Sequence, residues 1–570
     1  MLPTRSRSEN AMSAVPMSNV PTSLFDLSHF HRTSFAMGDL VPFYQEFCLP
    51  GDRWQLRVEA QLRTPSLYFP VMEKLEIHTA FFFVRYSALY DGWKAVVKPN
   101  FDDQISEEQI PYVQFTYQDS AGAADTTNWM KTIISYFGIP VPTVNPATDV
   151  TLKVNALPFA AYWKIWNDFY RDTIVQPEWG FPEGFFVRQT EEPLIRNLDL
   201  GDPNWTSDYL NYWDEWWLEM NGAIDPGGFV HREWMPTQRN WNPDYFTAGT
   251  YSPQYGEKVQ IPVFDQDLIG GPMNPSIGYG AATGTLPTGT NGLQVTPSGI
   301  ENTNSALISI DVSGTAGTLA QLRYAEALQT FLERVNRAGD RYRNHVREFY
   351  GADPGDSGDY AVYIGSQTSV IPIGEVWQTT PGTNDTEAGQ ELGAYAGRAI
   401  GQQFTNTFNY SCPDFGHLIG IINVQNRSSY HQGLSKYWTM ETWEDIPQAQ
   451  FAHIGDEEVL ERELLLRMDL GFDNENQLRT FSYVPRYSWM RYRNDYISGE
   501  LRKFYTQFHM SRSWPETGTT PQFNGRFLQA HDIPVDQAIR VNADYHSVYA
   551  WIWTQAQVIR ALPKYGVPML

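Results

Sequence analysis

The chain has 570 residues, of which 42% are hydrophobic and only 19% are charged, and its formal net charge is −24. This length is ample for a large core and suggests one to three domains. The low charge and the 15% aromatic content exclude a disordered chain and favour large buried interfaces. The strong negative charge makes the protein, taken alone, a poor binder of phosphate backbones.

Few residues point to covalent, metal or membrane attachment. The two cysteines, Cys48 and Cys412, cannot form a disulfide framework or a four-ligand zinc site. Apolar runs such as 80–84 and 418–422 are far shorter than a membrane span, so we predict no membrane insertion. Residues 1–24 lack the apolar segment of a signal peptide, and we interpret them as a polar N-terminal arm.

Strand patterns recur at wide intervals along the chain. Residues 75–83 alternate, which predicts a strand with one fully buried side. The residues on that side are Leu75, Ile77, Thr79, Phe81 and Phe83. Four further segments are predicted to be extended: 57–62, 370–377, 417–424 and 545–553, of which 417–424 is apolar on both faces. Distant strands with long excursions between them indicate an antiparallel sandwich with large insertions.

Two helices are predicted between these strands. Residues 157–172 have apolar side chains at helical spacing, and Pro158 suits a first helical turn. Residues 319–350 repeat an apolar stripe with a weak point at Gly339, and Gly351 follows as a stop signal.

Two blocks between the helices are unusual in composition. Residues 270–318 are rich in Gly, Thr, Ser, Asn and Pro and contain no Lys or Arg, which predicts a long surface excursion. Residues 204–221 place four tryptophans among acidic residues. The second block is either a helix that docks on a partner or an aromatic contact surface.

Catalytic signatures are thin, and we predict that the protein is not an enzyme. The carboxylates of Glu457, Glu458, Glu461 and Glu463 have the spacing of an exposed helix start. Glycoside hydrolysis needs two carboxylates that face each other across a cleft, which a sequence cannot show. A carbohydrate-binding or glycoside-active β-sandwich is therefore the alternative function.

One acidic turn has the spacing of oxygen ligands. Asp353, Asp356 and Asp359 resemble a loop calcium site, although no EF-hand Glu follows at the required distance. A solvated acidic turn is the simpler interpretation. Calcium is thus the only cofactor considered, and no other cofactor is expected.

One basic cluster stands out from the acidic background, at residues 485–494. Its arginines alternate with aromatic residues, a pattern that can neutralise phosphates and stack unpaired bases. The candidate DNA-contact residues are Arg486, Tyr487, Arg491, Tyr492 and Arg493. The alternative is a subunit contact, which we favour because Arg and Tyr also dominate protein interfaces.

The order of motifs along the chain resembles a known family. The matching segments are 25–52, 69–72 (Phe-Pro-Val-Met), 79–84 followed by Trp93, 157–172, 322–341, 349–351, 374–379, 417–424, 430–433, 451–464, 483–492 and 563–568. Together they resemble the major capsid protein of the microviruses, small single-stranded DNA phages, and in particular the gokushovirus branch. The matches run from about residue 25 to 570, so no single short motif carries the resemblance.

The resemblance implies a mainly β fold, an eight-stranded antiparallel jelly roll of viral capsid type with long loop insertions and a few helices. Residues 25–570 would form one jelly-roll domain, with 319–350 as its long helix and 200–318 as a variable surface insertion. Such a protein assembles as a 60-subunit T=1 icosahedral shell around a circular single-stranded DNA genome. The insertion would then be used in attachment to a receptor on the bacterial host surface.

The resemblance also implies partners. Members of this family are accompanied by a small basic DNA-packaging protein, an internal scaffolding protein and a DNA pilot protein. A charge of −24 fits that dependence, because such a subunit cannot condense DNA by bulk electrostatics. The expected location is the virion, with assembly in the cytoplasm of the host cell.

Overall fold

In a computed structural model, the chain divides into two compact units, residues 1–253 with 338–570, and residues 254–337. The structure describes residues 22–67, 69, 71–90, 92–97, 110–117, 130–141, 150–176, 235–254, 294–296, 299–301, 319–338, 342–350, 359–371, 373–374, 398–443, 445–470, 474–518, 521–531, 533–539 and 546–564. Most of the predicted polar arm and all of the Trp-rich block 204–221 lie outside these residues.

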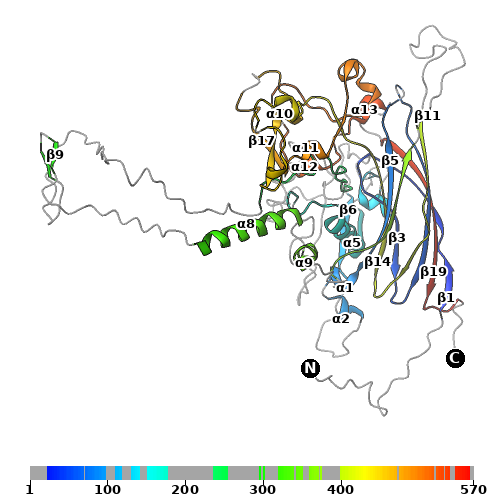
Figure 1. Cartoon of the computed structure of the whole chain (residues 1–570). Helices are drawn as coiled ribbons and strands as arrows, with labels where there is room; N and C mark the ends of the chain where they lie inside the picture. Colours follow the sequence, from blue (N-terminus) through cyan, green and yellow to red (C-terminus); the bar gives the residue numbers. More distant parts are fainter. Residues whose placement is uncertain are drawn as a thin grey trace, which may run out of the picture. The chain divides into compact units, whose positions relative to one another are not determined.

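Two antiparallel sheets form the body of the first unit (Figure 1). The seven-stranded sheet contains β1 (Ser23–Asp26), β2 (His29–Phe35), β4 (Arg53–Arg63), β11 (Ile373–Gly374), β12 (Arg398–Phe404), β13 (Phe408–Ser411) and β19 (Val548–Arg560). The four-stranded sheet contains β3 (Val41–Cys48), β5 (Leu75–Arg85), β10 (Val362–Ile371) and β14 (Gly416–Asn426).

The strand order is that of a jelly roll. The first sheet has the strand order β1-β19-β4-β12-β11. Strands β1 and β2 pair with successive parts of β19, and strands β12 and β13 pair with successive parts of β4. The second sheet runs β10-β5-β14-β3. The predicted mainly β, antiparallel jelly-roll class is therefore confirmed. The sheets contain seven and four strands, so the count of eight stays a prediction.

The two sheets pack face to face through interdigitating aromatic side chains. On β4 every second side chain is buried, which leaves the alternate ones on the opposite face of the sheet. The ring of Phe83 on β5 lies 5.3 Å from that of Tyr410 on β13. Gly365 on β10 is required by this contact, because a Cβ there would lie 2.4 Å from the ring of Phe408.

The four-stranded sheet is also covered on its second face. Helix α5 (Leu157–Ile165) continues as the π-helical turn Trp166–Tyr170 and packs on this face (Figure 1). Helix α4 (Ile133–Tyr136) belongs to the same apolar cluster. As a result all eleven residues of β14 are buried, as its two apolar faces predict. The structure also buries Ala80 and Phe82 of β5, which lie on the side opposite the predicted core face.

The predicted strand and helix positions agree with the structure to different degrees. Segments 57–62, 417–424 and 545–553 lie in or overlap β4, β14 and β19. Segment 370–377 is shifted, because it contains only the end of the long strand β10, at Val370 and Ile371, and the short strand β11. Residues 319–350 contain two helices, α8 (Leu319–Ala338) and α9 (Tyr342–Tyr350), and the described part of 200–318 includes the pair β8 (Gln294–Thr296) and β9 (Gly299–Glu301).

Smaller elements complete the first unit. They are α1 (Tyr86–Leu89), α2 (Trp93–Val97), β6 (Tyr112–Tyr117), β7 (Val150–Asn155), β15 (Ser429–Tyr430), β16 (Asp456–Leu460), α10 (Glu461–Leu464), β17 (Thr480–Pro485), α11 (Ser488–Arg491), β18 (Asp495–Tyr496), α12 (Gly525–Leu528) and α13 (Val535–Ala538). None of the described helices is long and apolar enough to cross a membrane.

The predicted exposed helix start at the glutamate cluster is confirmed only in part, because α10 begins at Glu461 and carries Glu461 and Glu463 in its first turn. Glu457 and Glu458 lie in strand β16, which pairs with β17 in an antiparallel hairpin. Glu463 is buried, and its carboxylate accepts hydrogen bonds from the Tyr245 hydroxyl at 2.9 Å and from the Leu460 backbone N–H at 3.0 Å. Pairing with β17 therefore overrides the helical spacing at Glu457 and Glu458.

A turn glycine offers a first test of the fold. Gly38 has φ 91°, and a Cβ there would lie 2.1 Å from the carbonyl oxygen of Ala530, whereas Gly51 has φ 89° with open space around it. We expect Gly51→Ala to lower the free energy of unfolding by about 1–2 kcal/mol through backbone strain alone. Gly38→Ala should cost roughly 1–3 kcal/mol more, because the backbone of Ala530 has to move. Chemical denaturation of both variants measures the difference, and equal losses would contradict the predicted clash.

A buried histidine offers a second test. Burial in the sheet lowers the pKa of His417 to about 3, and its ring Nδ1 lies 2.9 Å from the Tyr86 hydroxyl. Since the unfolded chain binds this proton near pH 6.5, the stabilisation is complete above that pH and is lost as pH falls towards 3. Between pH 6 and 4 the wild type should lose up to about 1.4 kcal/mol per pH unit more than His417→Gln. Denaturation curves across this range give the comparison, and parallel pH profiles would exclude the effect.

Candidate functional site

The basic cluster at residues 485–494, called the Arg–Tyr cluster from here on, is divided in the structure into a buried part and an exposed part. Tyr487 follows β17 with a positive φ of 63°, and its ring is buried. The backbone N–H of Gln448 donates to its hydroxyl at 3.3 Å, and the Arg486 guanidinium lies 5.3 Å from its ring centre. Hydrogen bonds from Arg486 and Gln448 lower the pKa of Tyr487. These two candidate residues therefore stabilise the local fold.

The other three members of the cluster lie on the surface. Arg491, Tyr492 and Arg493 are exposed at the end of α11, with 64% of Tyr492 accessible. The guanidinium of Arg493 lies 5.5 Å from the ring centre of Tyr496, which is also exposed. This arrangement can contact either unpaired bases or a neighbouring protein surface. The assignment of DNA contacts to the cluster stays a prediction.

The region around the cluster, residues 427–531, exposes many large apolar side chains. They are Tyr437, Trp438, Trp443, Ile446, Ile454, Met468, Leu478, Met490, Tyr492, Tyr496, Phe504 and Tyr505. Trp438 is 68% accessible, and its ring lies 4.7 Å from that of Tyr437. Exposed aromatic groups of this kind mark protein–protein interfaces. We therefore take the 427–531 region as the candidate assembly surface.

A buried arginine holds the 427–531 region together. Arg512 is almost inaccessible, and its guanidinium lies 4.1 Å from the ring centre of Phe527 and 5.2 Å from those of Trp241 and Trp514. It also donates to the Phe527 carbonyl oxygen at 2.8 Å. Cation–π contacts that are shielded from water contribute about 2 kcal/mol or more. No sequence pattern predicted a role for Arg512, although Trp514 lies only two residues away.

The candidate calcium ligands lie mostly outside the described residues. Asp353 and Asp356 lie outside the described residues, whereas Asp359 is described and is exposed. Within the described part of the chain, no three His, Cys, Asp or Glu side chains form a group that could hold a metal ion. Both cysteines are buried free thiols. Calcium binding at the acidic turn stays a prediction.

Comparison with known proteins identifies the family to which the chain belongs. The chain matches the model of the "Capsid protein (F protein)" family over residues 13–192 and 204–570. It is 24% identical to capsid protein VP1 of Chlamydia phage 1, with 99% of this chain and 98% of the relative covered. It is 24% identical to capsid protein VP1 of Bdellovibrio phage phiMH2K, with 98% and 97% covered, and 20% identical to that of Spiroplasma virus 4, with 97% and 96% covered.

These matches extend over nearly the whole chain, as do the motifs that resemble the microvirus capsid proteins. They confirm that resemblance, and they replace the alternative of a carbohydrate-active sandwich with a structural, non-enzymatic role. The chain belongs to the phage capsid protein (F protein) family and is a structural protein of the virion.

Proposed function

We propose that the chain assembles as sixty copies into a T=1 icosahedral shell that encloses a circular single-stranded DNA genome. The observation that supports this most strongly is the family match along nearly the full length of a jelly-roll chain. A closed icosahedral shell in which every subunit has the same environment takes sixty copies related by two-, three- and five-fold axes.

Assembly would follow from the balance between apolar contact and charge. Exposed aromatic side chains of the 427–531 region bury against neighbouring subunits, and many individually weak contacts add up over the shell. The net charge of −24 on each subunit makes the subunits repel one another, which opposes premature closure. Salt or bound cations, with calcium at Asp353, Asp356 and Asp359 as one candidate, would reduce this repulsion.

The same negative charge bears on the partners. An isolated subunit should bind single-stranded DNA weakly at physiological salt, so packaging calls for a small basic DNA-packaging protein. An internal scaffolding protein and a DNA pilot protein complete the expected set of partners, with assembly in the host cytoplasm. The 200–318 insertion remains our candidate for attachment to the bacterial receptor, because its composition suits an exposed excursion.

The mass of the assembled particle tests the proposal. Sixty copies of a 65.2 kDa chain give about 3.9 MDa before any genome is added. The purified chain, or the chain co-expressed with its phage partners, should sediment at that mass and appear as closed shells in negative-stain micrographs. A chain that remains monomeric in the presence of those partners would contradict the proposal.

Two exposed aromatic residues test the assembly surface. We expect Trp438→Ser combined with Tyr492→Ser to move the protein from shells to free subunits, because each aromatic lost from an interface centre costs about 2 kcal/mol or more. Both side chains are exposed in the subunit, so its unfolding temperature should stay nearly unchanged. The conservative pair Trp438→Phe and Tyr492→Phe is the matched control and should keep assembling. Normal shells from the serine variant, seen by sedimentation, would exclude these residues from the interface.

A further inference from the structure

The outward face of the seven-stranded sheet differs from the rest of this acidic chain. Strands β19 and β4 pair in register, so their outward side chains form rows across the sheet. Tyr549 lies opposite Arg63, Trp551 opposite Gln61 and Trp553 opposite Glu59. Strand β2 extends these rows on one side and β12 on the other. We call this surface, formed by β1, β2, β4, β12, β13 and β19, the open face.

The described side chains of the open face carry net positive charge. Its described charged side chains are Arg32, Arg53, Arg57, Arg63, Asp26 and Glu59, which gives four positive and two negative groups. All four arginines are exposed, and none forms an ion pair with another residue in the part of the chain that the structure describes. A net charge of +2 on one face of a chain with −24 overall is a local reversal of sign.

Aromatic rings lie between these arginines on adjacent strands of the open face. Phe30 on β2 is 50% accessible, and its ring centre lies 4.2 Å from that of Trp553 and 5.0 Å from that of Trp551. Phe404 on β12 is 51% accessible and Tyr549 is 47% accessible. Exposed rings on a sheet surface are the means by which RNA-binding sheets and single-strand-binding proteins stack bases.

The remaining outward positions include six amides and three exposed apolar side chains. The amides are Gln55, Gln61, Gln402, Gln555, Gln557 and Asn409, and the apolar side chains are Leu24, Ile400 and Ile559. Amide side chains can both donate to and accept from the polar edges of bases, which unpaired strands expose. An obligate protein interface would instead be more apolar at its centre and poorer in charge.

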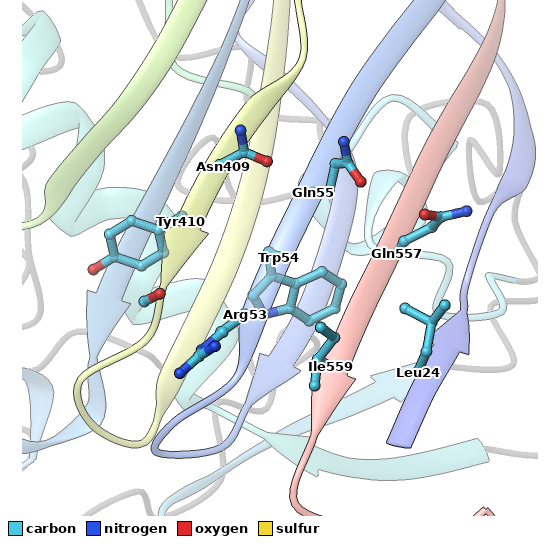
Figure 2. A pocket seen from close by; sticks show the side chains of 9 residues that line it. Leu24, Arg53, Trp54, Gln55, Asn409, Tyr410, Gln557 and Ile559 are labelled. Atoms are coloured by element: carbon cyan, nitrogen blue, oxygen red, sulfur yellow. The ribbon is translucent and has the colours of Figure 1, made fainter. Parts of the chain in front are cut away.

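A pocket of about 350 Å³ lies at one end of the open face (Figure 2). Leu24, Arg53, Gln55, Gln557 and Ile559 line it from β1, β4 and β19, and Asn409 and Ser411 line it from β13. Its volume falls at the lower end of the range of small-molecule sites, about 300–1,000 Å³. Trp54 also lines the pocket, and its buried indole N–H has no hydrogen-bond partner in the described part of the chain.

We propose that the open face binds single-stranded nucleic acid, with the arginines on phosphates, the aromatic rings on bases and the amides on base edges. The proposal deepens the proposed function, on which it rests, by assigning the genome contact to a surface other than the Arg–Tyr cluster. Charge decides between the possible occupants. Two copies joined by a two-fold axis would place the four arginines of one open face against those of the other, whereas a phosphate backbone is complementary to them.

Photo-cross-linking locates the contact directly. The full-length protein is mixed with a thymidine 30-mer that contains 4-thiothymidine at low salt, irradiated, digested and analysed by mass spectrometry. We expect cross-linked peptides from β2, β4, β12 and β19, with Phe30, Trp551, Trp553 and Phe404 as the modified residues. Cross-links confined to Arg491–Arg493 and their neighbours would overturn the proposal in favour of the Arg–Tyr cluster.

Matched charge variants test the energetic role of the open face. Arg53→Gln, Arg57→Gln and Arg63→Gln together should weaken 30-mer binding at low salt at least about tenfold. They should also reduce the slope of log K against log salt by about 2, since single strands give about 0.7 per phosphate contact. The control triple variant Arg479→Gln, Arg491→Gln and Arg493→Gln removes the same charge from exposed positions of the 427–531 region and should leave both quantities unchanged. Phe404→Ser should weaken binding about tenfold with an unchanged slope, because it removes stacking alone.

The outcomes separate this proposal from the proposed function. The proposal would be overturned if the open-face triple variant bound the 30-mer with wild-type affinity and salt slope. It would also be overturned if the open face were protected from hydrogen exchange in DNA-free shells, because that result would show that a second subunit covers this face. Shell formation by all variants is followed in parallel by negative-stain microscopy. A failure of the wild type to form shells in the presence of its phage partners contradicts the proposed function, while the cross-linking map still decides whether the open face binds the strand.

Discussion

The burial of the four-stranded sheet on both of its faces is the constraint on which the rest of the structure depends. Strand β14 has no exposed residue, so its polar side chains depend on partners within the protein, although the buried amide of Gln425 has none among the described residues. The side chain of Asn423 donates to the Asp39 carbonyl oxygen at 3.0 Å, and His417 is bound to Tyr86 in its neutral form. The second covering layer comes from α5, whose Tyr162 hydroxyl donates to the Leu40 carbonyl oxygen at 2.7 Å. Loss of α5 would expose an apolar sheet face, so we regard the helix as part of the core.

The seven-stranded sheet is built under the opposite condition. Its side chains alternate between a buried and an accessible face, as in β4, and within the described residues the accessible face carries no covering element. The chain thereby has two surfaces of different chemistry. The 427–531 region exposes apolar rings suited to protein contacts, whereas the open face combines arginine, amide and aromatic side chains. One fold can in this way serve both shell closure and contact with a genome.

The sequence predicts those parts of the fold in which local pattern and tertiary packing agree. The alternation of β5 and the double apolar face of β14 identify both strands, and Pro158 lies in the first turn of α5 as expected. The helix at the glutamate cluster begins only at Glu461, because β-pairing with β17 holds Glu457 and Glu458 in a strand. The Arg–Tyr cluster is divided because Tyr487 adopts a positive φ that turns its ring inward, which no residue pattern reveals. The open face could not be predicted at all, since Phe30, Arg57 and Trp553 become neighbours only through strand register.

A phosphate strand can bind a locally positive face of a strongly negative subunit because salt limits the distance over which charges act. At physiological ionic strength the Debye length is about 8 Å, so acidic groups on distant surfaces barely weaken a phosphate contact made at Arg57. Beyond that distance the strand meets the net charge of the subunit, which is repulsive. Four arginines can neutralise only a few phosphates in each subunit, so they can position a strand but cannot condense a genome. We therefore propose a division of labour in which a basic packaging partner would supply the bulk neutralisation and the open face would determine where the strand meets the shell.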